Sequence, residues 1–103
     1  MGPKTQELLK MLDDITAMLE SYGESHWARW IGDDASRLRS GDLTAIEHFL
    51  GAFGGMGSLN DLTICPENGH RVTEEETSAA NERLSHALSE AWSLARMLAG
   101  RGV

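Results

Sequence analysis

Hydrophobic positions near the N-terminus recur at alternating steps of four and three residues, which places them on one face of an α-helix. These positions are Leu8, Leu12, Ile15, Leu19 and Tyr22. Pro3 suits the first turn of such a helix, because its missing N–H would have no partner there. The pattern therefore predicts a helix that begins near residues 3–5 and ends at Gly23, where a left-handed cap is expected.

A second helix is predicted over residues 26–40, with Ser25 as its capping residue. Its inner side carries five apolar residues, namely Trp27, Trp30, Ile31, Ala35 and Leu38. Gly32 lies inside this helix, where glycine costs about 1 kcal/mol relative to alanine. A glycine at that place predicts either a kink or a close contact with another helix.

Two more helices complete the pattern. Asp42 is expected to cap a short helix over residues 43–53. Thr73 and Glu76 match the capping box, in which each side chain accepts a hydrogen bond from the backbone N–H of the other residue. The last helix is predicted to run from this box toward Ala99.

One helical domain is the simplest organisation for this chain. Its 103 residues, of which 41% are hydrophobic, suffice for one core but not for two. The apolar repeat of the long helices is too short to indicate a coiled coil. We therefore predict an all-α fold over residues 1–103, a small four-helix antiparallel bundle, with a homodimer formed through the terminal helices as the alternative to a monomer.

The connection between the last two predicted helices differs in composition from the rest of the chain. Residues 54–70 read GGMGSLNDLTICPENGH, with glycine at four of seventeen positions. Asn68-Gly69 is a favoured tight-turn pair, so a short β-hairpin over residues 62–72 is expected, although Pro66 cannot donate to a ladder. Positive φ angles or close backbone approaches are expected at Gly51, Gly54, Gly55 and Gly57.

This long loop has a structural and a functional interpretation. Its apolar residues are expected to pack over one end of the bundle, while Asn60 and Asp61 form hydrogen bonds with the backbone of the loop itself. Long ordered loops are also frequent binding surfaces. The functional hypothesis that we favour is therefore recognition of a partner by the loop.

Two chemical alternatives use the same residues. A phosphate-binding loop is disfavoured, because the glycines are followed by no GK[ST] sequence. Ser58, Asp61 and His70 have the residue types of a catalytic triad, and Cys65 with His70 those of a nucleophile and its base. No nucleophile elbow surrounds the serine, so we expect binding and not catalysis. The alternative is a small enzyme or ligand-binding domain centred on the loop.

Neither a metal nor another cofactor is expected. A structural zinc site needs four ligands with recognisable spacing. The four histidines are far apart and form no H-x-x-x-H pair: they are His26, His48, His70 and His86. Cys65 is the single cysteine, which excludes a disulfide bond within the chain.

The charge of the chain narrows the class of partner. Sixteen acidic residues outnumber nine basic ones, which gives a formal net charge of −7. Such a balance argues against nucleic acid, since binding to phosphates needs clustered Lys and Arg. It favours a basic protein as the partner. No stretch approaches the roughly 18 apolar residues of a membrane span, and the N-terminus does not read as a secretory signal, so a cytoplasmic protein without a membrane partner is expected.

Three phrases of the sequence carry a resemblance to a known family. FGGMGSLNDL, PENGH and NERL, together with HWARWI and GDL upstream, resemble a family of small bacterial helical proteins. The resemblance extends over most of the chain and implies a helical fold, but it implies no catalytic residue. In size and acidity the chain is also similar to immunity proteins of bacterial toxin systems.

We therefore predict a small acidic protein that binds and inhibits a basic partner, most concretely an immunity-type inhibitor of a bacterial toxin or effector. The acidic residues would supply charge and the loop would supply shape. The expected partner-binding residues are Asp33, Asp34, Met56, Ser58, Leu59, Asn60, Asp61, Asn68 and His70.

Overall fold

The computed structural model describes residues 1–54 and 56–100, and within these residues every regular element is helical. The α-helices are α1 Pro3–Ser21, α2 Ser25–Arg39, α3 Thr44–Leu50 and α4 Thr77–Gly100. Two short 3-10 turns, η1 Leu59–Asp61 and η2 Pro66–Asn68, lie in the connection between α3 and α4. The predicted all-α class is confirmed. No helix among the described residues is long and apolar enough to cross a lipid bilayer.

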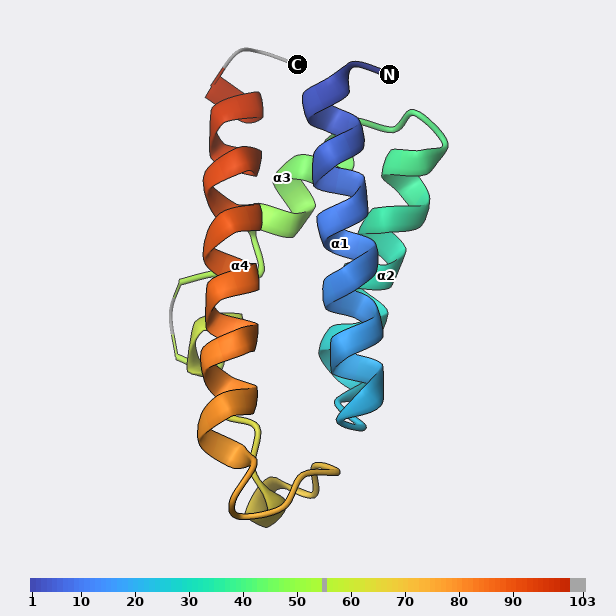
Figure 1. Cartoon of the computed structure of the whole chain (residues 1–103). Helices are drawn as coiled ribbons and strands as arrows, with labels where there is room; N and C mark the ends of the chain where they lie inside the picture. Colours follow the sequence, from blue (N-terminus) through green and yellow to red (C-terminus); the bar gives the residue numbers. More distant parts are fainter. Residues whose placement is uncertain (55, 101–103) are drawn as a thin grey trace.

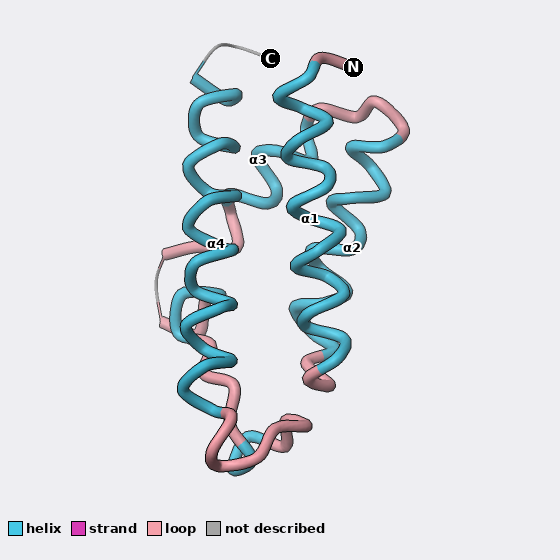
Figure 2. The backbone as a smooth tube through the Cα atoms, in the orientation of Figure 1, coloured by secondary structure: helices cyan, strands magenta, loops and turns pink. Residues whose placement is uncertain are grey.

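Three long helices and one short helix surround the core (Figure 1). α1 and α2 form an antiparallel hairpin, and α4 lies on the other side of α1, antiparallel to it. The short α3 contacts both α2 and α4, so it closes the bundle behind α1. The connection that follows α3 runs alongside α4 to the end of the molecule where α4 begins (Figure 2). The largest fully buried apolar side chains come from α1, α2, α3 and this connection: Leu8, Leu12, Ile15, Leu19, Ile31, Leu38, Phe49, Leu59 and Ile64.

Most of the predicted helix ends are confirmed. Gly23 has a φ of +75°, and the capping box forms, with Thr73 N donating to Glu76 Oε1 at 2.9 Å and Glu76 N to Thr73 Oγ1 at 3.3 Å. The cap of α2 differs from the prediction. Glu24, and not Ser25, caps this helix, because its longer side chain reaches the N–H of Trp27 at 3.0 Å.

The third helix is shorter than predicted and ends at Leu50 instead of residue 53. Leu43, and not Asp42, occupies the N-cap position and has no side-chain cap bond, but Asp42 Oδ1 accepts from the N–H of Thr44, the first residue of the helix, at 3.0 Å. Glycine is a poor helix former, and the chain reverses soon after Gly51, so that Leu59 N donates to Ala52 O at 2.8 Å.

The glycine predictions hold in part. Gly54 and Gly57 have φ angles of +90° and +78°, as expected. Gly51, in contrast, has an ordinary helical φ of −66°, so the positive φ does not occur there, but a Cβ at this position would lie 3.3 Å from His48 O, which is a close backbone approach. Gly55 lies outside the described residues.

The hairpin predicted over residues 62–72 does not form. Pro66 instead begins η2, which Gly69 closes with a φ of +81° and a hydrogen bond from its N–H to Pro66 O at 2.9 Å. The backbone N–H and C=O of Ile64, which a second strand would need, are both bonded at 2.8 Å to the side-chain amide of Asn81 on α4. A side chain of another helix therefore replaces the missing strand.

Gly32 marks a close contact between α1 and α2. A methyl group built on it would lie 3.4 Å from Thr16 Cγ2 on α1, which is an ordinary van der Waals distance. Of the two alternatives for this glycine, the close helix contact is confirmed.

Replacing Gly32 by alanine tests this contact. The added methyl group fits against Thr16, and alanine has the higher helix propensity, so Gly32→Ala is expected to raise the free energy of unfolding by about 0.5–1 kcal/mol. Urea denaturation followed by circular dichroism measures this change. Gly32→Leu is the matched variant, and it should destabilise the protein because the larger side chain has no room. A stable leucine variant would show that the two helices are not closely packed here.

Candidate functional site

The connection between α3 and α4 is fixed to the bundle at its far end by a pair of ionisable side chains, Glu24 and His70. His70 Nε2 lies 3.1 Å from Glu24 Oε1, and His70 Nδ1 accepts a hydrogen bond from Cys65 N at 3.1 Å. Because Nδ1 accepts, the ring proton is on Nε2 and is donated to the carboxylate. Both side chains are largely buried, with 5% of the His70 side chain and 14% of the Glu24 side chain exposed. We call this pair, with its bonds to Trp27 N and Cys65 N, the Glu24–His70 clamp.

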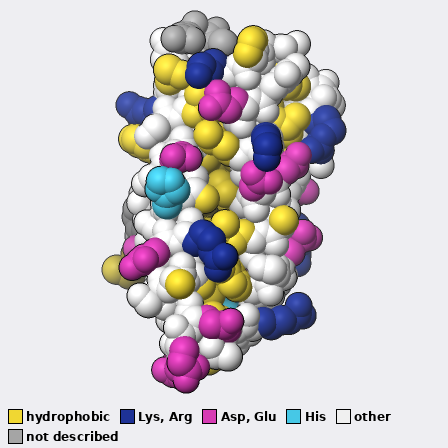
Figure 3. All heavy atoms as spheres, in the orientation of Figure 1, with side chains coloured by type: hydrophobic (Ala, Val, Ile, Leu, Met, Phe, Trp, Pro, Cys, Tyr) yellow, Lys and Arg dark blue, Asp and Glu magenta, His cyan; other side chains and the backbone are white. Residues whose placement is uncertain are grey.

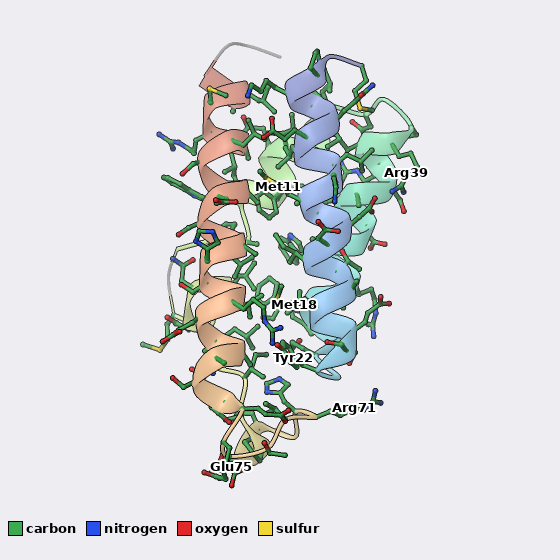
Figure 4. All side chains as sticks on the ribbon, viewed as in Figure 1. Met11, Met18, Tyr22, Arg39, Arg71 and Glu75 are labelled. Carbon is green, nitrogen blue, oxygen red and sulfur yellow. The ribbon has the colours of Figure 1, made fainter. Side chains whose placement is uncertain are left out.

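Backbone and phenol groups reinforce the clamp at the same end of the molecule (Figure 4). Arg71 N donates to Tyr22 O at 2.8 Å, and Arg83 of α4 donates to the hydroxyl of Tyr22 at 2.8 Å. Tyr22 thus connects the end of α1 to both the loop and α4. Partial burial raises the pKa of Glu24, but the hydrogen bonds from Trp27 N–H and His70 outweigh this effect, and the net pKa is lowered.

A groove of about 650 Å³ lies between the loop and α4. Its apolar walls come from Phe53, Leu59 and Leu62 of the loop and from Leu84, Leu88 and Trp92 of α4, and its polar lining from Asn60, Thr63, Asn81, Ser85 and Ser89. Trp92 is 39% exposed, and Arg96 lies over its ring at 5.4 Å from the centroid. We call this surface the loop–α4 groove.

The tip of the loop is ordered by two side chains of η1. Asn60 Oδ1 accepts from Gly54 N at 3.0 Å, and Asp61 Oδ2 accepts from Gly57 N at 2.8 Å. The expected bonding of these two residues to the loop backbone is confirmed. Met56, which precedes the bonded Gly57, is fully exposed, at 100%. The loop therefore displays an apolar side chain next to a glycine whose N–H is bonded.

A second group of side chains lies where α3 packs against α2. Asp34 is fully buried, at 0% exposure, and its Oδ1 lies 2.5 Å from His48 Nδ1. The His48 ring is stacked on Trp30, with centroids 4.4 Å apart and an interplanar angle of 18°. Burial raises the pKa of Asp34 to about 6, although the His48 hydrogen bond and charge act in the opposite direction.

Several predicted binding residues do not face solvent. Asp34, Leu59 and His70 are buried and present little surface to a partner, although Leu59 lines one wall of the loop–α4 groove. Each has an internal use: Asp34 binds His48, Leu59 fills the core, and His70 forms the clamp. Exposed side chains remain at Asp33, Met56, Asn60, Asp61 and Asn68, while Ser58 is half-buried with an unpartnered Oγ among the described residues.

Several of the acidic residues that were expected to supply charge are engaged within the fold. Of the acids near α2 and α3, Glu24 and Asp34 are engaged with histidines, and Asp42 pairs with Arg37 at 3.1 Å. Asp33 and Glu47 are exposed. On the face shown in Figure 3, a stripe of hydrophobic side chains runs between α1 and α4, with acidic and basic side chains mixed on both sides of it.

The side chains of the two candidate catalytic groups form no hydrogen bonds with one another among the described residues. His70 bonds to the backbone of Cys65 and not to its thiol, while Asp61 bonds to Gly57 and Ser58 Oγ has no partner among residues 1–54 and 56–100. None of these four side chains lines the loop–α4 groove. Within the same residues, no group of three or more His, Cys, Asp or Glu side chains is gathered in the way a metal site requires.

Two important residues escaped the sequence reasoning. His48 follows Asp34 on a different helix, and no spacing within one helix could have paired them. Asn81 had a detectable signal, since it precedes Leu84 by three residues and Leu88 by seven on the apolar stripe of α4. A polar residue on such a stripe indicates a buried hydrogen-bonding task.

The Glu24–His70 clamp can be tested with Glu24→Gln. A glutamine has one acceptor oxygen for the two donors, Trp27 N–H and His70 Nε2–H, and its NH₂ group would face a donor. We expect a loss of about 1–2 kcal/mol in the free energy of unfolding, measured by urea denaturation. Ser25→Ala is the matched control and should change stability little, because Ser25 does not cap α2. A larger loss for Ser25→Ala than for Glu24→Gln would contradict the clamp.

The buried Asp34 predicts a pH-dependent effect on stability. Its folded-state pKa of about 6 lies above the ordinary value of 3.8, so its contribution to stability is present below about pH 4 and is lost as the pH rises through 6. Asp34→Asn removes this loss. The variant should therefore gain about 2–3 kcal/mol relative to the wild type between about pH 4 and pH 8, measured by urea denaturation. The exposed neighbour variant Asp33→Asn should show no such gain, and equal pH profiles for wild type and Asp34→Asn would disprove the assignment.

Sequence comparison places this arrangement in a family. No curated protein and no solved structure matches the chain significantly. The family described as a domain of unknown function, DUF6966, matches residues 20–73, slightly more than half of the chain. This segment contains the Glu24–His70 and Asp34–His48 pairs, and the clamp joins residues near its two ends. The protein belongs to the DUF6966 family.

Proposed function

We propose that this protein works by binding another protein through the loop–α4 groove, and that the partner is basic. The observation that carries the proposal is the fully exposed Met56 in the loop, three residues from Phe53 and three from Leu59, which both line the groove. Exposed apolar side chains beside an apolar groove are typical of protein-binding surfaces.

The geometry of the surface suits a protruding apolar side chain of the partner. Trp92 and Phe53 offer aromatic surface, and the polar lining of Asn60, Ser85 and Ser89 can satisfy backbone groups of a bound segment. Asn60 and Asp61 bond to Gly54 N and Gly57 N, and these contacts lower the entropy cost of binding because they fix two loop positions before the partner arrives.

The net negative charge of the chain supports a basic partner but does not indicate which residues contact it. The net charge of −7 increases the rate of encounter with a basic protein, while the apolar anchors determine how long the complex persists. The most specific form of the proposal is an immunity-type inhibitor that covers the active site of a basic toxin. Small size and acidity support this form.

Affinity capture with paired variants tests the binding surface. The immobilised full chain is exposed to a lysate of the source organism, and retained proteins are identified by mass spectrometry. We expect a basic protein that is retained by the wild type and lost, by on the order of tenfold or more, with Met56→Ser and Trp92→Ser combined. Met97→Ser is the matched control, since Met97 is 38% exposed, as Trp92 is at 39%, but lies outside the groove.

Two results would count against the proposal. Undiminished retention by the double variant would show that the groove is not the binding surface. Retention that does not weaken with added salt would show that the negative charge of the chain has no part in the encounter.

A further inference from the structure

His48 has the surroundings of a chemically active histidine and lies outside the loop–α4 groove. Its Nδ1 is bonded to Asp34, while 41% of its side chain is exposed. Nε2 is therefore the ring nitrogen that has no partner among the described residues. Asp34 and Trp30, which contact the ring from two sides, are four residues apart on α2 and share one face of that helix.

The buried carboxylate determines which ring nitrogen can react. An ionised Asp34 accepts from Nδ1–H, so the lone pair of the neutral ring is on Nε2, at the exposed side. Positive charge that develops on the ring is stabilised by the carboxylate, because both lie where water does not screen them fully. Stacking on Trp30 holds the plane of the ring. Asp34 is thus a positioning residue for His48.

We propose that His48 Nε2 is an acceptor site for a phosphoryl group, delivered by an activated donor of the phosphoramidate or acyl phosphate class. The exposed ring lies outside the loop–α4 groove, so the proposed donor approaches it from the solvent side, either free or carried by another molecule.

The transfer balances without a further reactant. The Nε2 lone pair attacks phosphorus, the bond from phosphorus to the nitrogen or oxygen of the donor breaks, and its electron pair leaves with the amine or carboxylate. The ring keeps its proton on Nδ1, shared with Asp34, and gains one positive charge. This charge partly offsets the negative charge of the phosphoryl group, which matters because Asp33 and Glu47 are exposed nearby in the sequence and Arg37 is already paired with Asp42.

The other three histidines provide controls within the same molecule. His86 pairs with Glu90 at 3.2 Å, but both side chains are exposed, at 76% and 57%, so water weakens the effect of the carboxylate. His26 is exposed and packs edge-on against Trp27, with ring centroids 4.7 Å apart. His70 is buried in the clamp and is expected to react only if the protein unfolds.

The test treats the full chain with potassium phosphoramidate at about pH 8, above the pKa of Asp34, and in a parallel arm with acetyl phosphate. Mass spectrometry follows the addition of a phosphoryl group at each histidine. We expect His48 to react on the order of tenfold faster than His26 and His86 with at least one donor, which also identifies the donor class. His48→Gln should abolish this fast reaction.

Asp34→Asn decides whether the buried carboxylate is responsible. The variant should bring the rate at His48 down to that of His86, while the rates at His26 and His86 stay unchanged and His70 stays unreacted, which shows that the fold is retained. Two outcomes would overturn the proposal: a wild-type His48 no faster than His86 with either donor, or a fast reaction that survives Asp34→Asn. Both can be read in the same experiment as the folding control.

Discussion

The arrangement of this protein depends on one carboxylate, that of Glu24. With one oxygen it caps α2 through Trp27 N–H, and with the other it accepts the proton of His70, which lies 46 residues further along the chain. The same contact orients the loop so that Arg71 reaches Tyr22, and Tyr22 reaches Arg83 on α4. A side chain that ends one helix therefore also determines where the long connection meets the bundle.

A second histidine–carboxylate pair, Asp34 and His48, also takes its carboxylate from α2 but differs in which partner is buried. Glu24 begins α2 and Asp34 lies in its second half, so both carboxylates belong to one helix and reach across to the segment that follows it. In the first pair the histidine is buried and both of its nitrogens are bonded. In the second pair the carboxylate is buried and the histidine keeps one nitrogen free among the described residues. The first arrangement can only hold the structure together, whereas the second leaves chemistry available at the surface.

The helices could be predicted from the sequence, because their signals are local. The four-and-three spacing from Leu8 to Tyr22, the left-handed Gly23 and the capping box at Thr73 each depend on residues within a few positions of one another. The loop could not be predicted in the same way. Its hairpin pattern was overruled by Asn81, seventeen residues from the Ile64 groups that it binds, and the solvent-facing role expected for Asp34 was overruled by burial against α3. The number of acidic residues in a sequence does not reveal which of them are engaged inside the fold.

The antiparallel pairing of the first and last helices has a mechanical consequence. The beginning of α1 lies beside the end of α4 (Figure 1), and Glu7 and Met97 line a shared hollow, while the opposite ends are joined through Tyr22 and Arg83. Force that pulls the beginning of α1 away from the end of α4 would separate the two helices one turn after another. It would not break all of their contacts at once. The contacts at the outer ends would be lost first, and the hydrogen bonds of Tyr22 with Arg71 and Arg83 would be lost last.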